Sequence, residues 1–269
     1  MRLHPRLLIG LAVALVSLFS YFGTREYNPV TGETQHVSIR PEQEVALGLR
    51  AAPQMAQQYG GESDDPRSRA LVDQVGRKIV GNTDAGKTPY RFEFHALADP
   101  STINAFALPG GQVFITEGLL KRLETEGQLA GVLGHEVGHV VGRHGAEHIA
   151  KQQLTQGLTG AAVLATYDPS NPRSAQTAAM AMMVGQLVNM KFGRDDELES
   201  DQLGVRFLSE SGYDPRAMIR LMEILGEASK GNRQPEFFST HPNPGNRIAR
   251  IEQAIAQKFP SGMPAGLVP

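Results

Sequence analysis

Two histidines and a glutamate occur within five residues of this chain, in a segment that reads HEVGH. Because an α-helix has 3.6 residues per turn, His135 and His139 would point the same way and could bind one metal ion. Glu136 would lie about 100° further round the helix, where its carboxylate can accept a proton from a water held at that ion. Zinc suits such a set of ligands and lowers the pKa of the water towards neutrality. The segment therefore predicts peptide-bond hydrolysis with one zinc ion per chain.

The flanking residues predict the helix that this chemistry needs. Thr125 is a suitable N-cap, and Gln128 would complete a capping box. Apolar residues then recur at helical spacing, at Leu129, Val132, Leu133, Val137, Val140 and Val141. A second face carries the glycines Gly127, Gly131, Gly134, Gly138, Gly142 and Gly145. Each glycine inside a helix costs about 1 kcal/mol relative to alanine, so we expect another helix or strand to pack closely on this face. The alternative is a broken helix with loops.

An HExxH segment needs a third protein ligand, and His144 is one candidate. A third histidine ten residues after the first would complete a known zinc-binding pattern, but that position is Gly145. If the helix continues, His144 and His148 point away from His135. We therefore expect both to be surface histidines or to lie in a second layer behind the ligands.

The second candidate is Glu197, in a segment that reads ELESD. Glu197 and Asp201 are four residues apart and share a helix face. Glu197 could bind zinc, while Asp201 could accept a hydrogen bond from the far nitrogen of a ligand histidine and so set its tautomer. The alternative is an ordinary acidic helix start, in which Asp195, Asp196 and Glu197 complement the positive end of the helix dipole.

Taken together, these motifs resemble the M48 family of zinc metallopeptidases, and within it the bacterial periplasmic or outer-membrane-associated members. The resemblance covers about residues 28 to 258. Besides HEVGH and the ExxxD spacing, it rests on the segments NPVTG at 28–32, NAFALPGG at 104–111, GYDP at 212–215, STHP at 239–242 and RI at 247–248. The chain departs from some relatives, since it has no cysteine for a lipid anchor and no 34-residue tetratricopeptide repeat is evident.

The resemblance implies that His135, His139 and Glu197 are the zinc ligands and that Glu136 is the general base. It also implies that His241 can approach the metal or the reaction intermediate. In some relatives this histidine occupies the open coordination position and keeps the enzyme inactive.

Two further roles remain open. Arg247 or His241 could stabilise the oxyanion of the reaction, so we count both with Glu136 as candidate catalytic residues. Arg247 could equally be a structural partner of a carboxylate. We expect Asp201 to orient a zinc-bound histidine.

Composition is compatible with a compact enzyme. The chain has 269 residues, a net charge of −2 and no basic run, which argues against nucleic-acid binding. The absence of cysteine excludes disulfides and a thiol nucleophile. The sequence leaves the oligomeric state open.

The N-terminus predicts a membrane anchor or a signal peptide. Arg2 and Arg6 precede an uncharged apolar stretch, residues 7–24, that is just long enough to span a bilayer. The positive flank would leave the enzyme outside, on the periplasmic side of the bacterial cell envelope. Since no clean cleavage site follows, we favour an uncleaved anchor. The expected organisation is a signal or anchor at 1–24, a linker at 25–38 and a metallopeptidase domain at 39–269.

The coarse pattern predicts an α+β fold: a mostly helical, zincin-like domain with one small β-sheet beside the HExxH helix. The expected strands are 91–97, 103–108 and 112–116, and the expected helices include 41–59 and others that begin near residues 66, 215 and 244. In zinc peptidases of this design an edge strand pairs with the substrate backbone. We expect 112–116 to be that strand, with Gly110 and Gly111 admitting the second backbone; the alternative is a simple hairpin.

The methionine-rich stretch 174–190 predicts core or lid packing, with membrane contact as the alternative. The function that follows is a zinc-dependent endopeptidase of the bacterial cell envelope. It would act in protein quality control and cleave misfolded or unassembled proteins with a zinc-activated water. The alternative is a chaperone-like envelope assembly factor whose proteolytic activity is latent.

Overall fold

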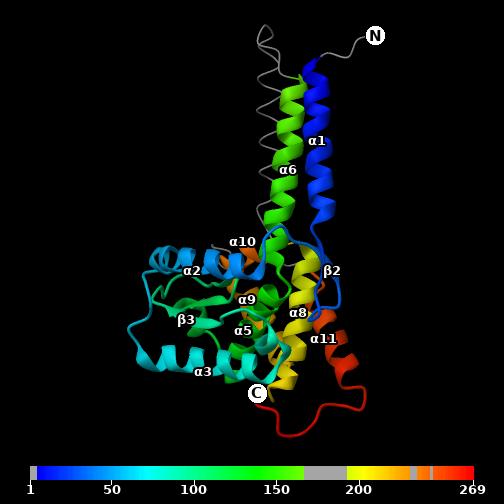
Figure 1. Ribbon diagram of the computed structural model, residues 1–269. Helices are drawn as coiled ribbons and strands as arrows, with labels where there is room; N and C mark the ends of the chain where they lie inside the picture. Colours follow the sequence, from blue (N-terminus) through cyan, green and yellow to red (C-terminus); the bar gives the residue numbers. More distant parts are fainter. Residues whose placement is uncertain (1–4, 167–192, 231–234, 243–244) are drawn as a thin grey trace. The chain divides into compact units, whose positions relative to one another are not determined.

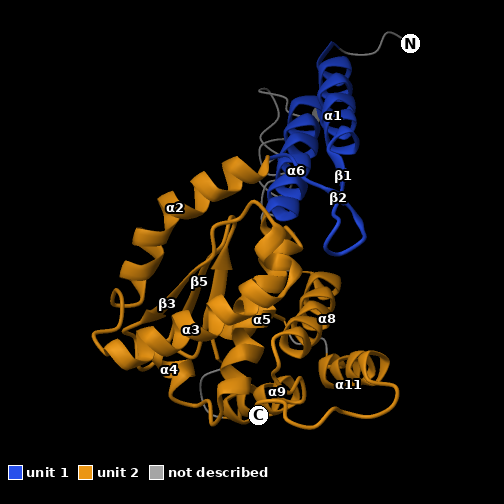
Figure 2. Ribbon diagram, turned by 60° about the horizontal axis from the view of Figure 1, so that its bottom comes forward, with its two compact units in different colours: residues 1–39, 146–191 blue, residues 40–145, 192–269 orange. Residues whose placement is uncertain are grey.

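The computed structural model describes residues 5–166, 193–230, 235–242 and 245–269 (Figure 1). The methionine-rich stretch 174–190 lies outside these ranges. By its internal contacts the chain divides into two compact units, residues 1–39 with 146–191 and residues 40–145 with 192–269 (Figure 2).

The first unit contains two long helices and a small hairpin. Its elements are α1 (Pro5–Gly23), β1 (Arg25–Tyr27), β2 (Thr34–His36) and most of α6 (His144–Thr166). The antiparallel strands β1 and β2 occupy the segment expected to be an extended linker. The NPVTG motif forms their turn, because the Asn28 side chain accepts a hydrogen bond from the Val30 amide and Gly32 adopts φ +80°. Small residues bring α1 and α6 together, since a Cβ on Gly10 would lie 2.7 Å from the carbonyl oxygen of Ala161.

The second unit places helices on both faces of a three-stranded sheet. The sheet has the order β3-β5-β4, with β5 parallel to β3 and antiparallel to β4. Its elements are α2 (Pro41–Gln58), α3 (Pro66–Asn82), a 3-10 turn η1 (Asp84–Lys87), β3 (Glu93–Leu97), β4 (Ala105–Leu108), β5 (Gln112–Thr116), α4 (Glu117–Leu120), α5 (Glu126–Val141), α8 (Arg194–Glu210), α9 (Ala217–Ala228), α10 (Phe237–Thr240) and α11 (Arg247–Lys258). The expected fold class, α+β with one small sheet beside the HExxH helix, is confirmed.

Side chains alternate between the two faces of the sheet along each strand, so apolar side chains on both faces are available to pack against helices. On one face Phe106 stacks on Phe114, and α2 covers the pair through Ala52 and Met55. On the other face Phe94 packs against α3, where Gly76 leaves room for its ring. Helix α5 lies against β4 and α3 (Figure 2).

Most expected helix faces are buried, with two exceptions. Val72, Val75 and Ile79 of α3 are fully buried, but Leu71 is 39 % exposed. Ile248 of α11 is also 39 % exposed. The apolar spacing of α3 and α11 predicts that Leu71 and Ile248 face inward, and this prediction is wrong. Helix α11 begins at Arg247, and the expected opening at residues 243–244 lies outside the described residues.

Candidate metal centre

The HEVGH segment lies on α5, a helix buried along almost its whole length. Thr125 caps it by accepting a hydrogen bond from the Gln128 amide. The Gln128 side chain accepts from the amide of Glu124 instead of Thr125, so the capping box is displaced by one residue. The apolar and the glycine faces are both covered, which explains how a helix with this many glycines is held.

Helix α8 packs on the glycine face of α5, as expected. A Cβ on Gly138 would lie 3.1 Å from the carbonyl oxygen of Ser200, and one on Gly134 would lie 2.8 Å from the Leu208 side chain. Gly142 and Gly145 lie beyond the end of α5. Close approach of the two backbones is what lets a carboxylate on α8 reach the histidines on α5.

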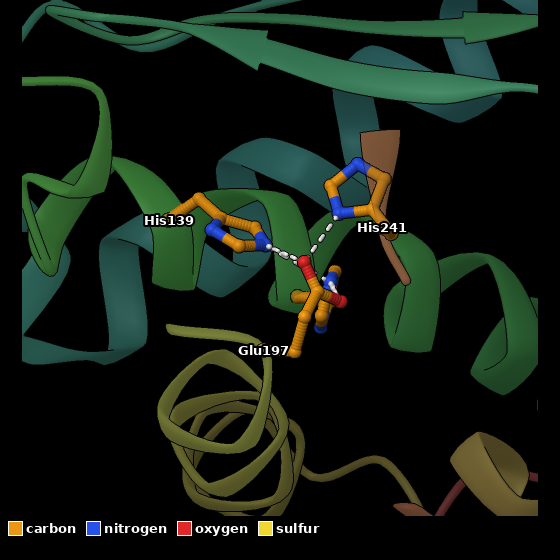
Figure 3. Close-up of side chains that lie close together, drawn as sticks. His139, Glu197 and His241 are labelled. Atoms are coloured by element: carbon orange, nitrogen blue, oxygen red, sulfur yellow. Dashed lines mark hydrogen bonds and ion pairs between the residues drawn. The ribbon is translucent and has the colours of Figure 1, made fainter. Parts of the chain in front are cut away.

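His135, His139, Glu197 and His241 form a buried cluster. The Nε2 atoms of His135 and His139 lie 3.1 Å apart, and the Glu197 carboxylate lies 3.5 Å and 3.4 Å from them. Nδ1 of His241 lies 3.1 Å from Oε1 of Glu197. Figure 3 shows His139 and His241 converging on this carboxylate from two different elements. None of the four residues is more than 4 % exposed.

The cluster suits a divalent cation. One nitrogen or oxygen atom from each of its four residues lies within 4.8 Å of the others. The carboxylates of Glu136, Glu197 and Asp201 and the guanidinium of Arg247 are all buried at the cluster. Imidazole and carboxylate ligands together are typical of zinc.

The pKa shifts of Glu197 and His139 favour the protonation states that can bind a metal ion. Burial would raise the pKa of Glu197, but hydrogen bonds with His135, His139 and His241 lower it well below its usual range, so the group stays a carboxylate. Burial lowers the pKa of His139 well below its usual value, which keeps the imidazole neutral. A neutral imidazole and a carboxylate are the forms that bind metal.

Asp201 and Arg247 lie directly behind the cluster. Oδ1 of Asp201 lies 3.0 Å from Nδ1 of His135, on the side of the ring away from the cluster. Arg247 donates to both Asp201 oxygens, and its Nη1 lies 3.0 Å from Oε2 of Glu197. With its guanidinium bound to two carboxylates, Arg247 has the contacts of a structural partner, the alternative that the sequence left open.

The Glu136 carboxylate lies beside the cluster. The residue is fully buried, and neither of its carboxylate oxygens has a hydrogen-bond partner within the described residues. Burial raises its pKa. Nε2 of His241 lies 3.5 Å from Oε1 of Glu136.

His241 ends a short turn that is tethered at several points. The residue follows α10, and its ring stacks on Phe237 with centroids 4.4 Å apart. The Phe237 amide donates to the carbonyl of Ile103, just before β4. At the start of α10, Glu236 accepts hydrogen bonds from Tyr59 and Asn104.

His144 lies in a second layer, whereas His148 is half-buried. The helix does not continue through this region: α5 ends at Val141 and α6 begins at His144. The break turns His144 back towards His139. The premise of a continuous helix is therefore wrong, while the expectation that His144 lies behind the ligands agrees with its position.

The expectation that 112–116 is the substrate-binding edge strand is wrong. This strand, β5, is the centre of the sheet and is paired on both sides. Gly110 and Gly111 do admit a second backbone, but it belongs to this chain: their Cβ positions would lie 2.3 Å from Val45 and 2.6 Å from Arg91. Within the described residues β4 is the edge strand on the α5 side.

A family model for peptidase family M48 matches residues 66–255, which include every member of this cluster. The chain belongs to this family. The matched residues include α5 and α8, which carry His135, His139 and Glu197, and the three-stranded sheet. They also include His241 but not α2.

Named relatives come from bacteria and mitochondria. The β-barrel assembly-enhancing protease of Escherichia coli K12 is 33 % identical over 203 residues, which are 73 % of this chain and 41 % of the relative. The Yersinia pestis protein of the same name is 29 % identical over 242 residues, 86 % of this chain and 48 % of the relative. The mitochondrial metalloendopeptidase OMA1 of Schizosaccharomyces pombe is 33 % identical over 242 residues, 88 % of this chain and 68 % of the relative. The chain thus spans less than half the length of these bacterial relatives.

Sequence reasoning missed three residues next to the site. Glu44 pairs with Arg143 behind the end of α5, and Glu199 pairs with His144. Glu44 lies on α2, far from the motif in sequence, and no local pattern connects the two. Glu199 looked like one more acidic residue at a helix start. Gly142 could have predicted the contact of Glu199, because glycine commonly marks a helix end. A helix end at Gly142 implies a turn before His144, the residue that Glu199 contacts.

Proposed function

We propose that this chain is a zinc-dependent endopeptidase of the bacterial cell envelope that acts in protein quality control and cleaves misfolded or unassembled proteins. The observation that carries the proposal is the buried cluster of His135, His139, Glu197 and His241, with the Glu136 carboxylate beside it. Membership of peptidase family M48 supports the reaction type.

Each residue of the site has its own role in the proposed reaction. His135, His139 and Glu197 would hold zinc, which when bound supplies a Lewis acid that polarises the scissile carbonyl. Glu136 accepts the proton of the attacking water and passes it to the leaving amine. Asp201 accepts from Nδ1 of His135 and so orients that ring.

We propose that His241 restrains this site. Its ring lies between Glu197 and Glu136, where a substrate carbonyl would have to bind. Cleavage would therefore require the side chain of His241 to move away from Glu136 and Glu197. This contact supports a self-restrained resting state.

The test pairs metal content with cleavage of an unfolded protein such as casein. We expect one zinc per chain, no cleavage by Glu136→Gln with zinc retained, and faster cleavage by His241→Ala. A folded wild-type protein that takes up no zinc would overturn the proposal. So would zinc-loaded wild type and His241→Ala that both leave casein and other unfolded proteins intact.

The envelope location and the substrates are inferred from relatives. Two of them are named β-barrel assembly-enhancing proteases and a third a mitochondrial metalloendopeptidase. All three names denote proteolysis, so we do not favour a chaperone-like role with latent activity. Comparing Glu136→Gln with wild type in cells separates the two, because a binding role would survive the substitution.

Helix α1 supports a membrane anchor. It is long and apolar enough to cross a bilayer and lies near the N-terminus. Its large side chains are open to solvent, with Phe19 84 % and Val16 68 % exposed. Intact mass and alkaline extraction of the protein from membranes test the anchor. Retention of residues 1–24 with resistance to extraction is the expected result, and a chain that starts after residue 24 would show a cleaved signal peptide instead.

A further inference from the structure

His139 has a buried partner that none of the roles above includes. Nδ1 of His139 lies 2.8 Å from Nδ1 of His144, on the side of the ring away from Glu197. Nε2 of His144 lies in turn 2.7 Å from Oε2 of Glu199 on α8. His144 is 1 % exposed and the Glu199 side chain 19 % exposed, so the inner contact is shielded from water.

The hydrogen positions in this chain of contacts follow from chemistry. If Nε2 of His139 binds the metal, its Nδ1 carries the hydrogen and donates it. Nδ1 of His144 must then accept, which leaves the His144 hydrogen on Nε2, pointing at the Glu199 carboxylate. Each of the three groups thus has one consistent role. Ser200 Oγ lies 3.5 Å from Nδ1 of His144, too far to compete with the 2.8 Å contact.

The backbone is bent to make this contact. Arg143 adopts φ +57°, the left-handed region that residues other than glycine rarely occupy. The bend returns the chain so that His144 faces His139. A side chain on Gly142 would block the ring, since its Cβ would lie 2.6 Å from Nε2 of His144.

A buried ion pair holds the bent residue. Nε and Nη2 of Arg143 lie 2.9 Å and 2.7 Å from Oε1 of Glu44 on α2. Glu44 is 1 % and Arg143 7 % exposed. Left-handed backbone at a non-glycine residue is strained and persists where its surroundings hold it, most often at functional sites.

We propose that His144 and Glu199 are positioning residues for the metal ligand His139, held in place by the Glu44–Arg143 pair. They do for His139 what Asp201 and Arg247 do for His135: they set the tautomer and fix the ring plane. The inference rests on the proposed function, because it assumes that His139 binds zinc. The two ligand histidines would then have different supports, a carboxylate for His135 and an imidazole backed by a carboxylate for His139.

Two substitutions at His144 test the proposal on the full-length chain. His144→Asn keeps an acceptor where Nδ1 now lies, whereas His144→Leu removes it at similar volume. Zinc affinity is measured by competition with a chromogenic chelator, on apo-protein whose fold is first checked by circular dichroism. We expect His144→Leu to weaken zinc binding about 10- to 100-fold and His144→Asn to stay near wild type.

Substitutions at Glu199 provide an independent test if His144→Leu fails to fold. Glu199→Gln retains an acceptor for the His144 N–H, and Glu199→Leu does not. We expect weaker zinc binding for Glu199→Leu than for Glu199→Gln. Equal zinc affinity within each pair of variants would overturn the positioning role while leaving the proposed function intact. Absence of zinc binding in the wild type would instead overturn the proposed function itself.

Discussion

Arg247 holds both carboxylate oxygens of Asp201, through Nε and Nη2 at 2.7 Å each, while its third nitrogen lies 3.0 Å from Glu197. One guanidinium from α11 therefore connects Glu197, a candidate metal ligand, with Asp201, whose carboxylate lies 3.0 Å from His135. All three side chains are at most 1 % exposed. Their geometry depends on α8 and α11 staying packed.

Arg247→Met should destabilise the protein strongly. Removing one partner of a buried ion pair leaves an uncompensated buried charge and costs about 3–5 kcal/mol. Urea unfolding of the apo-protein measures the loss. The matched control is Arg216→Met, because Arg216 pairs with Asp214 at the surface and its side chain is 63 % exposed. Similar unfolding midpoints for the two variants would contradict the structural role of Arg247.

Gly138→Ala should weaken zinc binding and lower stability. The added methyl group would lie 3.1 Å from the backbone of Ser200, so α8 must shift away from α5 and carry Glu197 with it. Gly226→Ala in α9 is the control, since nothing lies within 4 Å of its Cβ position. It should raise the free energy of unfolding by about 0.4–1 kcal/mol. Thermal melts with and without zinc separate the two outcomes, and a gain of stability in Gly138→Ala would show that the helices are not in tight contact.

Tyr59→Phe should raise basal proteolysis. Tyr59 donates to Glu236 at the start of α10, and this turn carries His241. Loss of a hydrogen bond worth about 1 kcal/mol would move the balance towards the open turn about fivefold. Casein cleavage by wild type, Tyr59→Phe and the exposed-tyrosine control Tyr27→Phe gives the comparison. If Tyr59→Phe matched the control, the tether would have no part in restraining His241.

The same tyrosine predicts a change of stability at alkaline pH. Burial and the bond to Glu236 raise the pKa of Tyr59 to about 12, above the usual value of about 10. A group whose pKa is higher in the folded state contributes stability that is complete below pH 10 and is lost as the pH rises towards 12. Urea unfolding at a series of pH values from 9 to 12 should show a steeper decline for wild type than for Tyr59→Phe. Parallel curves would rule out this contribution.

Glu44→Gln should weaken zinc binding although it lies on α2, away from the cluster. The substitution removes the carboxylate charge that Arg143 contacts on α2, so we expect the left-handed turn to relax and His144 to move away from His139. Adding Arg143→Gly removes the buried charge and supplies a residue that adopts φ +57° without strain. The double variant should therefore bind zinc more tightly than Glu44→Gln alone. Zinc affinity is measured by chelator competition. A double variant that binds zinc no more tightly than Glu44→Gln would contradict the role of the turn at Arg143 in positioning His144.

The sequence predicts this site well where it follows a helical period. His135 and His139 share one face of α5, and Glu197 and Asp201 share one face of α8, because each pair is four residues apart. The glycine face of α5 predicts the close approach of α8. The resemblance to the M48 family adds His241 and Arg247, whose distance from the other residues along the chain no periodicity could bridge.

Other features depend on tertiary structure. The position of β5 at the centre of the sheet follows from a parallel pairing with β3 that strand patterns do not encode. The break between α5 and α6 occurs at Arg143, where a left-handed residue other than glycine is held by a partner 99 positions away. The pairing of β5 with β3 and the Glu44 partner of Arg143 could not be predicted from the neighbouring residues.

The contact between His241 and Glu197 has a consequence for inhibitors. A side chain tethered next to its own target acts as a competitor at a fixed, high effective concentration. If His241 restrains the site as proposed, every molecule that enters the centre must first displace it, and the measured dissociation constant equals the intrinsic one divided by the fraction of open chains. Chemically unrelated inhibitors should therefore all gain affinity by one common factor in His241→Ala, and that factor is a direct measure of how seldom the wild-type site opens.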